Sequence, residues 1–369
     1  MKFEFKKQAS RVLDYIIFPG VIYFFEEERD TENEIMKSVI SKDYINFIEN
    51  MNDLLVPYKD EIMKYYNKDI YSSYDFSNIL IHGFPLYDYK SEHSFLSEIL
   101  SYDENTLRKT MIKTLISLED GEEDVEEDVE ESSIAFNDEE FTEATALSFI
   151  NELQVDASNK WNLLMMIQKP KQYLRGFIDL LEKVQSIFYR YYDTKEDEVI
   201  QYGENLEKRL SNNTEKTFKE ITHEAISYDF GGSDVCYLYV SAMYPYSLRF
   251  LNTKQRRIVW GIKTEESFKA LNEIRQDKLS ERVKIFKALG DKTRYETLKL
   301  LANGVTSIKD IAHKLDVSSA TISYHINEFL TSGIINLKFE KSKKAGYKVD
   351  YKKLQDVMGE LIKDLNFPE

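Results

Sequence analysis

Two stretches near the end of the chain carry side chains suited to contact nucleic acid. The outer face of a short predicted helix, residues 318–327, is small and polar, and the loop 340–346 contains three lysines. Hydroxyl, amide and ring groups on a helix can reach base edges in the major groove, and lysines bind phosphates. We therefore predict nucleic-acid contacts from Ser318, Ser319, Thr321, Ser323, Tyr324, His325, Asn327, Lys341, Lys343 and Lys344.

The surrounding sequence predicts the elements that would position these side chains. Helix-capping residues at Asp291, Ser307 and Ser318, and glycines at 290, 304 and 333, divide the region into consecutive short helices. The helices capped by Ser307 and Ser318 are separated by a tight turn, which is a helix-turn-helix arrangement. A hairpin from 334 to 351 follows, with the three lysines at its tip. Such a hairpin beside the second helix, which we call the reading helix, is a wing that can track phosphates.

Four segments in this region carry a family resemblance. They are FKALGDKTR (286–294), IKDIA (308–312), VSSATISYHI (317–326) and LTSGII (330–335). In this order and spacing they resemble the winged-helix domain of ArsR/SmtB-type transcription regulators. The resemblance covers roughly 85 residues. It implies a cytoplasmic, homodimeric regulator that binds an inverted repeat in DNA, often as a repressor released by an effector.

The chain departs from this family at the metal-binding positions. The third helix of the domain, 307–315, has no Cys, and neither His nor Cys follows His325. Zinc sites need several converging nitrogen or sulfur ligands, so the family's metal sites are absent and we predict no metal and no other cofactor. Lys292 also stands where the family commonly has Pro, a minor change in a first helical turn.

The last predicted helix, 352–365, has one apolar face. So short a helix needs a partner surface, which could be its own domain, the N-terminal region or a second copy of the chain. The resemblance favours a second copy, paired together with the helix 279–289. The predicted dimerisation residues are Leu354, Val357, Met358, Leu361, Ile362 and Leu365.

Charge is distributed unevenly along the chain. The 369 residues carry a formal charge of −16, yet residues 280–369 carry +4 and the preceding 279 residues −20. A basic module on an acidic body is typical of a nucleic-acid-binding protein whose whole surface does not bind DNA indiscriminately. In the segment 119–131, ten of thirteen residues are acidic, which favours a solvated loop. An alternative hypothesis is that this segment mimics DNA phosphates and contacts the basic patch of the C-terminal module.

Residues 1–275 are predicted to be mostly helical. Only 13 Gly and 6 Pro interrupt the chain, and helical apolar periodicity is strongest over 173–192. Residues 235–262 are rich in β-branched and aromatic side chains and predict short strands in a hairpin or small meander. The apolar segment 12–25 is too short to span a membrane and is expected in the core, as is the single cysteine, Cys236.

The overall prediction is a mainly α protein with minor β structure and two parts. Residues 1–275 form an acidic effector, partner or dimerisation region, and residues 276–369 form a winged helix-turn-helix. Its predicted partners are double-stranded DNA, a second copy of the chain and an unknown small-molecule or protein effector. We predict no membrane partner. No phosphate loop, HExxH or nucleophile elbow is present, so we predict that it is not an enzyme. Two alternatives stay open: a protein-interaction adaptor that uses the winged helix, and an enzyme with an appended winged helix.

Overall fold

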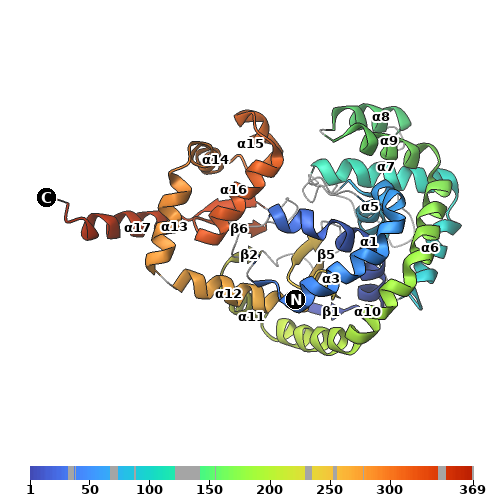
Figure 1. The fold of residues 1–369 in the computed structure, drawn as a ribbon, viewed down its shortest axis with the longest axis horizontal. Coiled ribbons are helices and arrows are strands. Elements are labelled where there is room, and N and C mark those ends of the chain that lie inside the picture. Colours follow the sequence, from blue (N-terminus) through green and yellow to red (C-terminus); the bar gives the residue numbers. More distant parts are fainter. Residues whose placement is uncertain are drawn as a thin grey trace. The chain divides into compact units, whose positions relative to one another are not determined.

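The fold is known from a computed structural model (Figure 1). The chain forms two compact units, between which it crosses several times. The first unit holds residues 1–28, 42–211 and 233–262, and the second holds 29–41, 212–232 and 263–369. The second unit thus includes more than 276–369, and the predicted boundary at 275/276 stays a prediction. The structure describes residues 1–31, 37, 39–66, 74–86, 89–120, 142–153, 155–228, 235–251, 256–276, 278–339 and 346–367.

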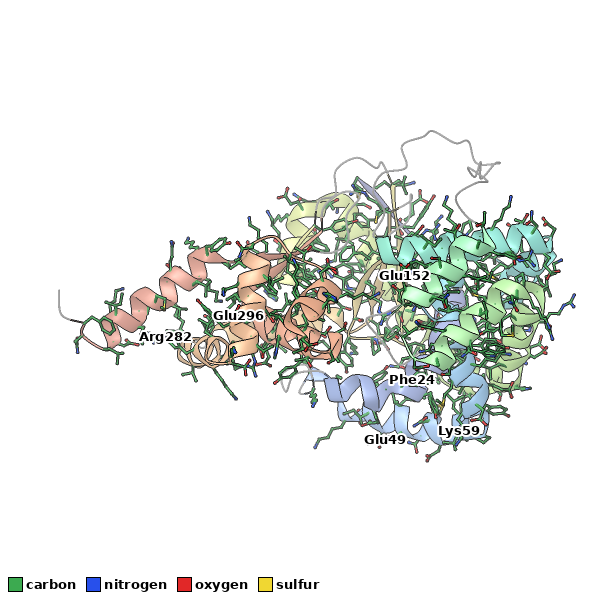
Figure 2. All side chains as sticks on the ribbon, turned by 90° about the horizontal axis from the view of Figure 1, so that it is seen from above. Phe24, Glu49, Lys59, Glu152, Arg282 and Glu296 are labelled. Carbon is green, nitrogen blue, oxygen red and sulfur yellow. The ribbon has the colours of Figure 1, made fainter. Side chains whose placement is uncertain are left out.

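The first unit is built from helices around a small sheet. As predicted, the apolar segment 12–25 is buried, and it lies in α1. The helix predicted over 173–192 makes up most of the N-terminal half of the 43-residue α10. The helices are α1 (Lys7–Thr31), α3 (Lys42–Leu55), the 3-10 helix η1 (Val56–Tyr58), α4 (Lys59–Tyr65), α5 (Phe76–Gly83), α6 (Glu92–Ser101), α7 (Glu104–Asp120), α8 (Glu143–Glu152), α9 (Ala157–Gln168) and α10 (Pro170–Asn212). Side chains of α1, α3 and α4 are drawn in Figure 2, where Phe24, Glu49 and Lys59 are labelled.

The sheet of the first unit has the strand order β1-β3-β5-β4. Its strands are β1 (Lys2–Phe5), β3 (Val235–Ser241), β4 (Leu248–Leu251) and β5 (Arg256–Gly261). The predicted hairpin is present, because β4 and β5 pair antiparallel. A meander is wrong: β3 pairs with β5 in parallel, and the N-terminal strand β1 pairs with β3 in parallel. Four residues at the N-terminus gave too little periodicity to predict β1.

Hydrogen bonds attach α1 to the carboxyl end of β3. The Val240 N–H donates to Ser10 Oγ at 2.9 Å, and the Ser241 hydroxyl donates to Asp14 Oδ1 at 2.5 Å. The Ala242 N–H donates to Asp14 Oδ2 at 2.8 Å. A carboxylate with no exposed surface is costly unless it is hydrogen-bonded, and here it closes the turn after the strand.

The second unit contains the predicted helix-turn-helix and additional elements. Its helices are α11 (Thr214–Thr222), α12 (Thr264–Gln276), α13 (Lys278–Leu289), α14 (Lys292–Ala302), α15 (Ile308–Leu315), α16 (Ser319–Ser332) and α17 (Tyr351–Asp364). Its strands are β2 (Ile226–Tyr228), β6 (Ile335–Phe339) and β7 (Gly346–Val349). The predicted helices and hairpin therefore exist with boundaries within one or two residues, but β2 and its place in the hairpin's sheet were not predicted.

One apolar cluster forms the core of the helix-turn-helix part of the second unit. Ile285, Ile311, Ile322 and Phe329 are fully buried in it, with contributions from α13 to α17 and from the hairpin. On α13, Phe286 and Leu289 pack against this cluster, whereas Val283 is 57% exposed. None of the helices in the described part of the chain is long and apolar enough to cross a membrane.

Candidate nucleic-acid interface

The helix-turn-helix is α15, a tight turn and α16. Ser307 caps α15 by accepting from the Asp310 N–H, and Ser318 caps α16 by accepting from the Thr321 N–H at 3.1 Å. Between them Asp316 adopts φ 54°, the left-handed conformation that reverses the chain after a helix. Gly333, at φ 71°, ends α16 in the same conformation. Asp316 and Ser318 are only two residues apart, so adjacent residues set the turn between the two helices.

Part of the surface of the reading helix α16 is accessible to solvent. Ser318 is exposed, Tyr324 is 37% exposed, and Ser319, Thr321 and Asn327 are half-buried. The Ser318 hydroxyl also lies 2.8 Å from that of Thr321, so capping already engages it. These five predicted contacts share one accessible stretch of helix.

Two predicted contacts do not lie on that exposed face. Ser323 is only 2% exposed and His325 only 6%, so their assignment to the outer face of α16 is corrected. In the described part of the chain, Ser323 Oγ and both ring nitrogens of His325 are buried without a hydrogen-bond partner. Burial, followed by the neighbouring Arg294, lowers the pKa of His325, which favours the neutral imidazole.

The wing is a three-stranded sheet with the order β2-β6-β7. β6 and β7 form the predicted antiparallel hairpin, with Ile335 opposite Val349. β2 adds a parallel strand to β6, pairing Ile226 with Leu337 and Tyr228 with Phe339. The three lysines of the tip, Lys341, Lys343 and Lys344, lie outside the described residues, as do residues 121–131 of the acidic segment.

The contact between α14 and the reading helix could not be predicted from the sequence. Arg294 Nη1 lies 3.7 Å from Glu328 Oε2, and its guanidinium carbon lies 5.5 Å from the centre of the Tyr324 ring. Asp291 caps α14 by accepting from the Arg294 N–H at 2.8 Å, which fixes the base of the arginine side chain. The arginine three residues after the cap Asp291 is visible in the sequence, but its partner Glu328, 34 residues later, is not.

The apolar face of α17 is only partly covered. Val357 is buried and Leu354 packs against the core cluster. Met358, Ile362 and Leu365 are at least 50% exposed, and Leu361 is half-buried. In Figure 1 α17 extends away from the rest of the second unit. Ion pairs attach it to α13, from Arg282 (labelled in Figure 2) to Asp364 at 2.7 Å and from Lys353 to Glu281.

The described residues contain no group of three or more His, Cys, Asp and Glu side chains that could hold a metal ion. That the protein needs no metal stays a prediction. Cys236 is buried, as expected, and burial raises the pKa of its thiol to about 12, so the reactive thiolate is disfavoured.

Comparison with known proteins places this region in a family. The family model described as "Bacterial regulatory protein, arsR family" matches residues 291–336, which run from the cap of α14 into β6. A relative from Methanocaldococcus jannaschii, "Uncharacterized HTH-type transcriptional regulator MJ1325", is 38% identical over 88 residues. These residues are 24% of this chain and 93% of the relative. The comparison with solved structures finds no match.

Proposed function

The chain belongs to the arsR family of bacterial regulatory proteins, and from this membership we propose that it binds DNA as a homodimer on an inverted repeat. Family and relative support the coarser statement that it is a DNA-binding transcription regulator. The finer proposal is that it acts in the cytoplasm and that a non-metal effector or partner, taken up by residues 1–275, controls it. The family is one of regulators, which supports a role other than catalysis.

One observation carries the proposal. The reading helix begins at an exposed capping serine and presents small polar side chains along its accessible stretch. Its one formally charged residue, Glu328, is paired with Arg294 from α14. A neutral, polar helix end can enter the major groove without repelling phosphates.

The candidate contacts divide into two groups. We propose that Ser319, Tyr324 and Asn327 reach base edges. Ser323 and His325 are not proposed to touch DNA, because burial leaves them no surface for it. The proposed phosphate contacts, which should supply most of the affinity, are Ser318, Thr321, Lys341, Lys343 and Lys344.

The exposed apolar face of α17 supports the homodimer. Met358 and Ile362 are half exposed on a helix that ion pairs hold against α13. Val283 on α13 is also exposed, so both helices offer apolar surface to a partner. A two-fold axis here would place two reading helices about one DNA turn, ~34–36 Å, apart.

The strand β2 supports control by the N-terminal region. It follows α10 of the first unit through α11, and after residue 232 the chain returns to the first unit as β3. The wing therefore contains a strand whose two ends continue into the other unit. An effector that favours one conformation of the first unit would act on the wing through this strand, provided that it binds the two conformations unequally.

Selection of bound duplexes from a random DNA pool, at two salt concentrations, tests the proposal. We expect a palindromic consensus that survives at the higher salt, because specific contacts persist when phosphate attraction is screened. Recovery of unrelated sequences at low salt and none at high salt would contradict sequence-specific binding. A consensus without two-fold symmetry would contradict the homodimer but leave DNA binding in place.

A further inference from the structure

We propose that Arg294 is a positioning residue for DNA recognition, which holds Tyr324 in its reading orientation and neutralises Glu328. The inference rests on the proposed DNA binding of α16 and assigns a role to a residue outside that helix. The Arg294 guanidinium lies 5.5 Å from the ring centre of Tyr324 and 3.7 Å from the Glu328 carboxylate. One side chain thus contacts two residues one helical turn apart on the reading helix.

Arg294 itself is held in place from both ends. Its backbone N–H is bound by the cap Asp291, and its side chain is only 15% exposed. Its Nε is buried without a hydrogen-bond partner in the described part of the chain. Burying a guanidinium nitrogen without a hydrogen bond costs free energy. Here the contacts with the Tyr324 ring and the Glu328 carboxylate offset that cost. This arrangement restricts the rotamer of Tyr324, a residue that is still 37% exposed.

The charge of Glu328 gives Arg294 its second role. Glu328 is the single formally charged residue of α16, which otherwise holds neutral side chains. Its side chain is 27% exposed, so without Arg294 a carboxylate would stand on the helix that approaches phosphates. Like charges repel, so the unpaired carboxylate would weaken binding to every sequence, whereas a displaced Tyr324 would alter preference among sequences.

The two roles separate in a set of four proteins: wild type, Arg294→Gln, Glu328→Gln and the double variant. Each is titrated against the duplex selected by the wild type and against a set in which each base pair is changed in turn. We expect Arg294→Gln to weaken binding to all duplexes by roughly fivefold, the effect of about 1 kcal/mol. It should also flatten the preference at the base pair that Tyr324→Ala flattens.

The double variant should regain the affinity for all duplexes that Arg294→Gln loses, because its reading helix carries no unpaired charge. It should not regain the preference among base pairs. If it does not recover affinity, Arg294 contacts phosphate directly and the proposal is overturned. Arg294→Lys should restore much of the affinity while leaving the preference flattened, since an ammonium lacks the planar face that stacks on a ring.

Lys299→Gln is the matched control. Lys299 also lies on α14, pairs with a glutamate (Glu296, labelled in Figure 2) at 2.8 Å and lies 5.9 Å from a tyrosine ring, that of Tyr295. It removes the same charge from the same helix without touching α16, so affinity and preference should stay within twofold of wild type. If Arg294→Gln and Lys299→Gln changed affinity and base preference equally, Arg294 would act only through its positive charge and not as a positioning residue. Absence of wild-type binding to any duplex would instead contradict the proposed function.

Discussion

Asp14 links pH to the stability of the first unit. Burial raises the pKa of its carboxyl to about 7, against the opposing effect of hydrogen bonds from Ser241, Ala242 and Met243. In the unfolded chain the same group titrates near 3.8. Between these values the unfolded chain releases the proton while the folded chain keeps it, so rising pH destabilises the fold through this window.

We predict that the free energy of unfolding of the wild type falls with rising pH, and that Asp14→Asn removes this part of the pH dependence. From pH 5 to pH 7 the wild type should lose roughly 2 kcal/mol relative to the variant, at about 1.4 kcal/mol per pH unit with partial titration at the upper end. Urea unfolding of both proteins at the two pH values measures it. The variant's amide oxygen can replace Oδ2 and accept from both backbone N–H groups, but its NH2 group in place of Oδ1 cannot accept from the Ser241 hydroxyl. We therefore expect the variant to be less stable at both pH values. Only the difference in slope matters, and parallel pH profiles would refute the assignment.

Single residues also show where sequence reasoning reaches its limit. The caps Asp291, Ser307 and Ser318 are local signals, and each accepts the backbone hydrogen bond expected of it. Ser323 and His325 were placed outward from helical position alone, yet both are buried. Burial at the edge of a helix depends on what packs there from elsewhere in the chain, and no spacing within the helix encodes that.

At the scale of elements, the wing depends on a strand that the sequence did not reveal. β2 has three residues, too few for an alternating pattern, and its partner β6 begins more than a hundred residues later. The reading helix, by contrast, is specified within its own fourteen residues and caps. Local elements of this domain were therefore predictable, while the pairing that joins it to the rest of the chain was not.

Proline substitution in β2 tests its place in the wing. Alternate residues of an edge strand direct their N–H groups to the neighbouring strand, so of Ser227→Pro and Tyr228→Pro one removes a bond to β6 and the other does not. We expect the disruptive variant to speed hydrogen exchange of the β6 amides facing β2 by at least tenfold, while the β6–β7 amides stay protected. Exchange followed by NMR would show this. Identical protection in both variants would mean that β2 does not stabilise the wing.

The hairpin tip is the element expected to set salt dependence. Replacing Lys341, Lys343 and Lys344 by Ala should weaken binding to all duplexes alike and lower the slope of log K against log salt by up to about three. Binding isotherms from 50 to 200 mM salt measure it, with the selected duplex and a scrambled one compared throughout. An unchanged slope would refute the phosphate role of the wing.

For the whole molecule, charge and surface favour association through the second unit. The body carries −20 and the last ninety residues +4, so two bodies repel each other while two DNA-binding ends do so only weakly. The exposed apolar residues of α17 and α13 belong to the weakly charged end. Dimerisation there would bring two reading helices to one duplex.

Met358→Asp should therefore give a monomer. An aspartate on a half-exposed apolar face costs little in the free chain but places a charge in a desolvated interface. Sedimentation equilibrium should shift from about twice the chain mass of 43.5 kDa to once that mass. Affinity for the inverted repeat should fall at least a hundredfold, because each half-site then binds alone.

Met63→Asp is the matched control: this methionine on α4 is 53% exposed, against 51% for Met358, and its replacement should leave mass and affinity unchanged. A wild type that sediments as a monomer while binding the repeat, or a dimeric Met358→Asp, would place the symmetry axis elsewhere.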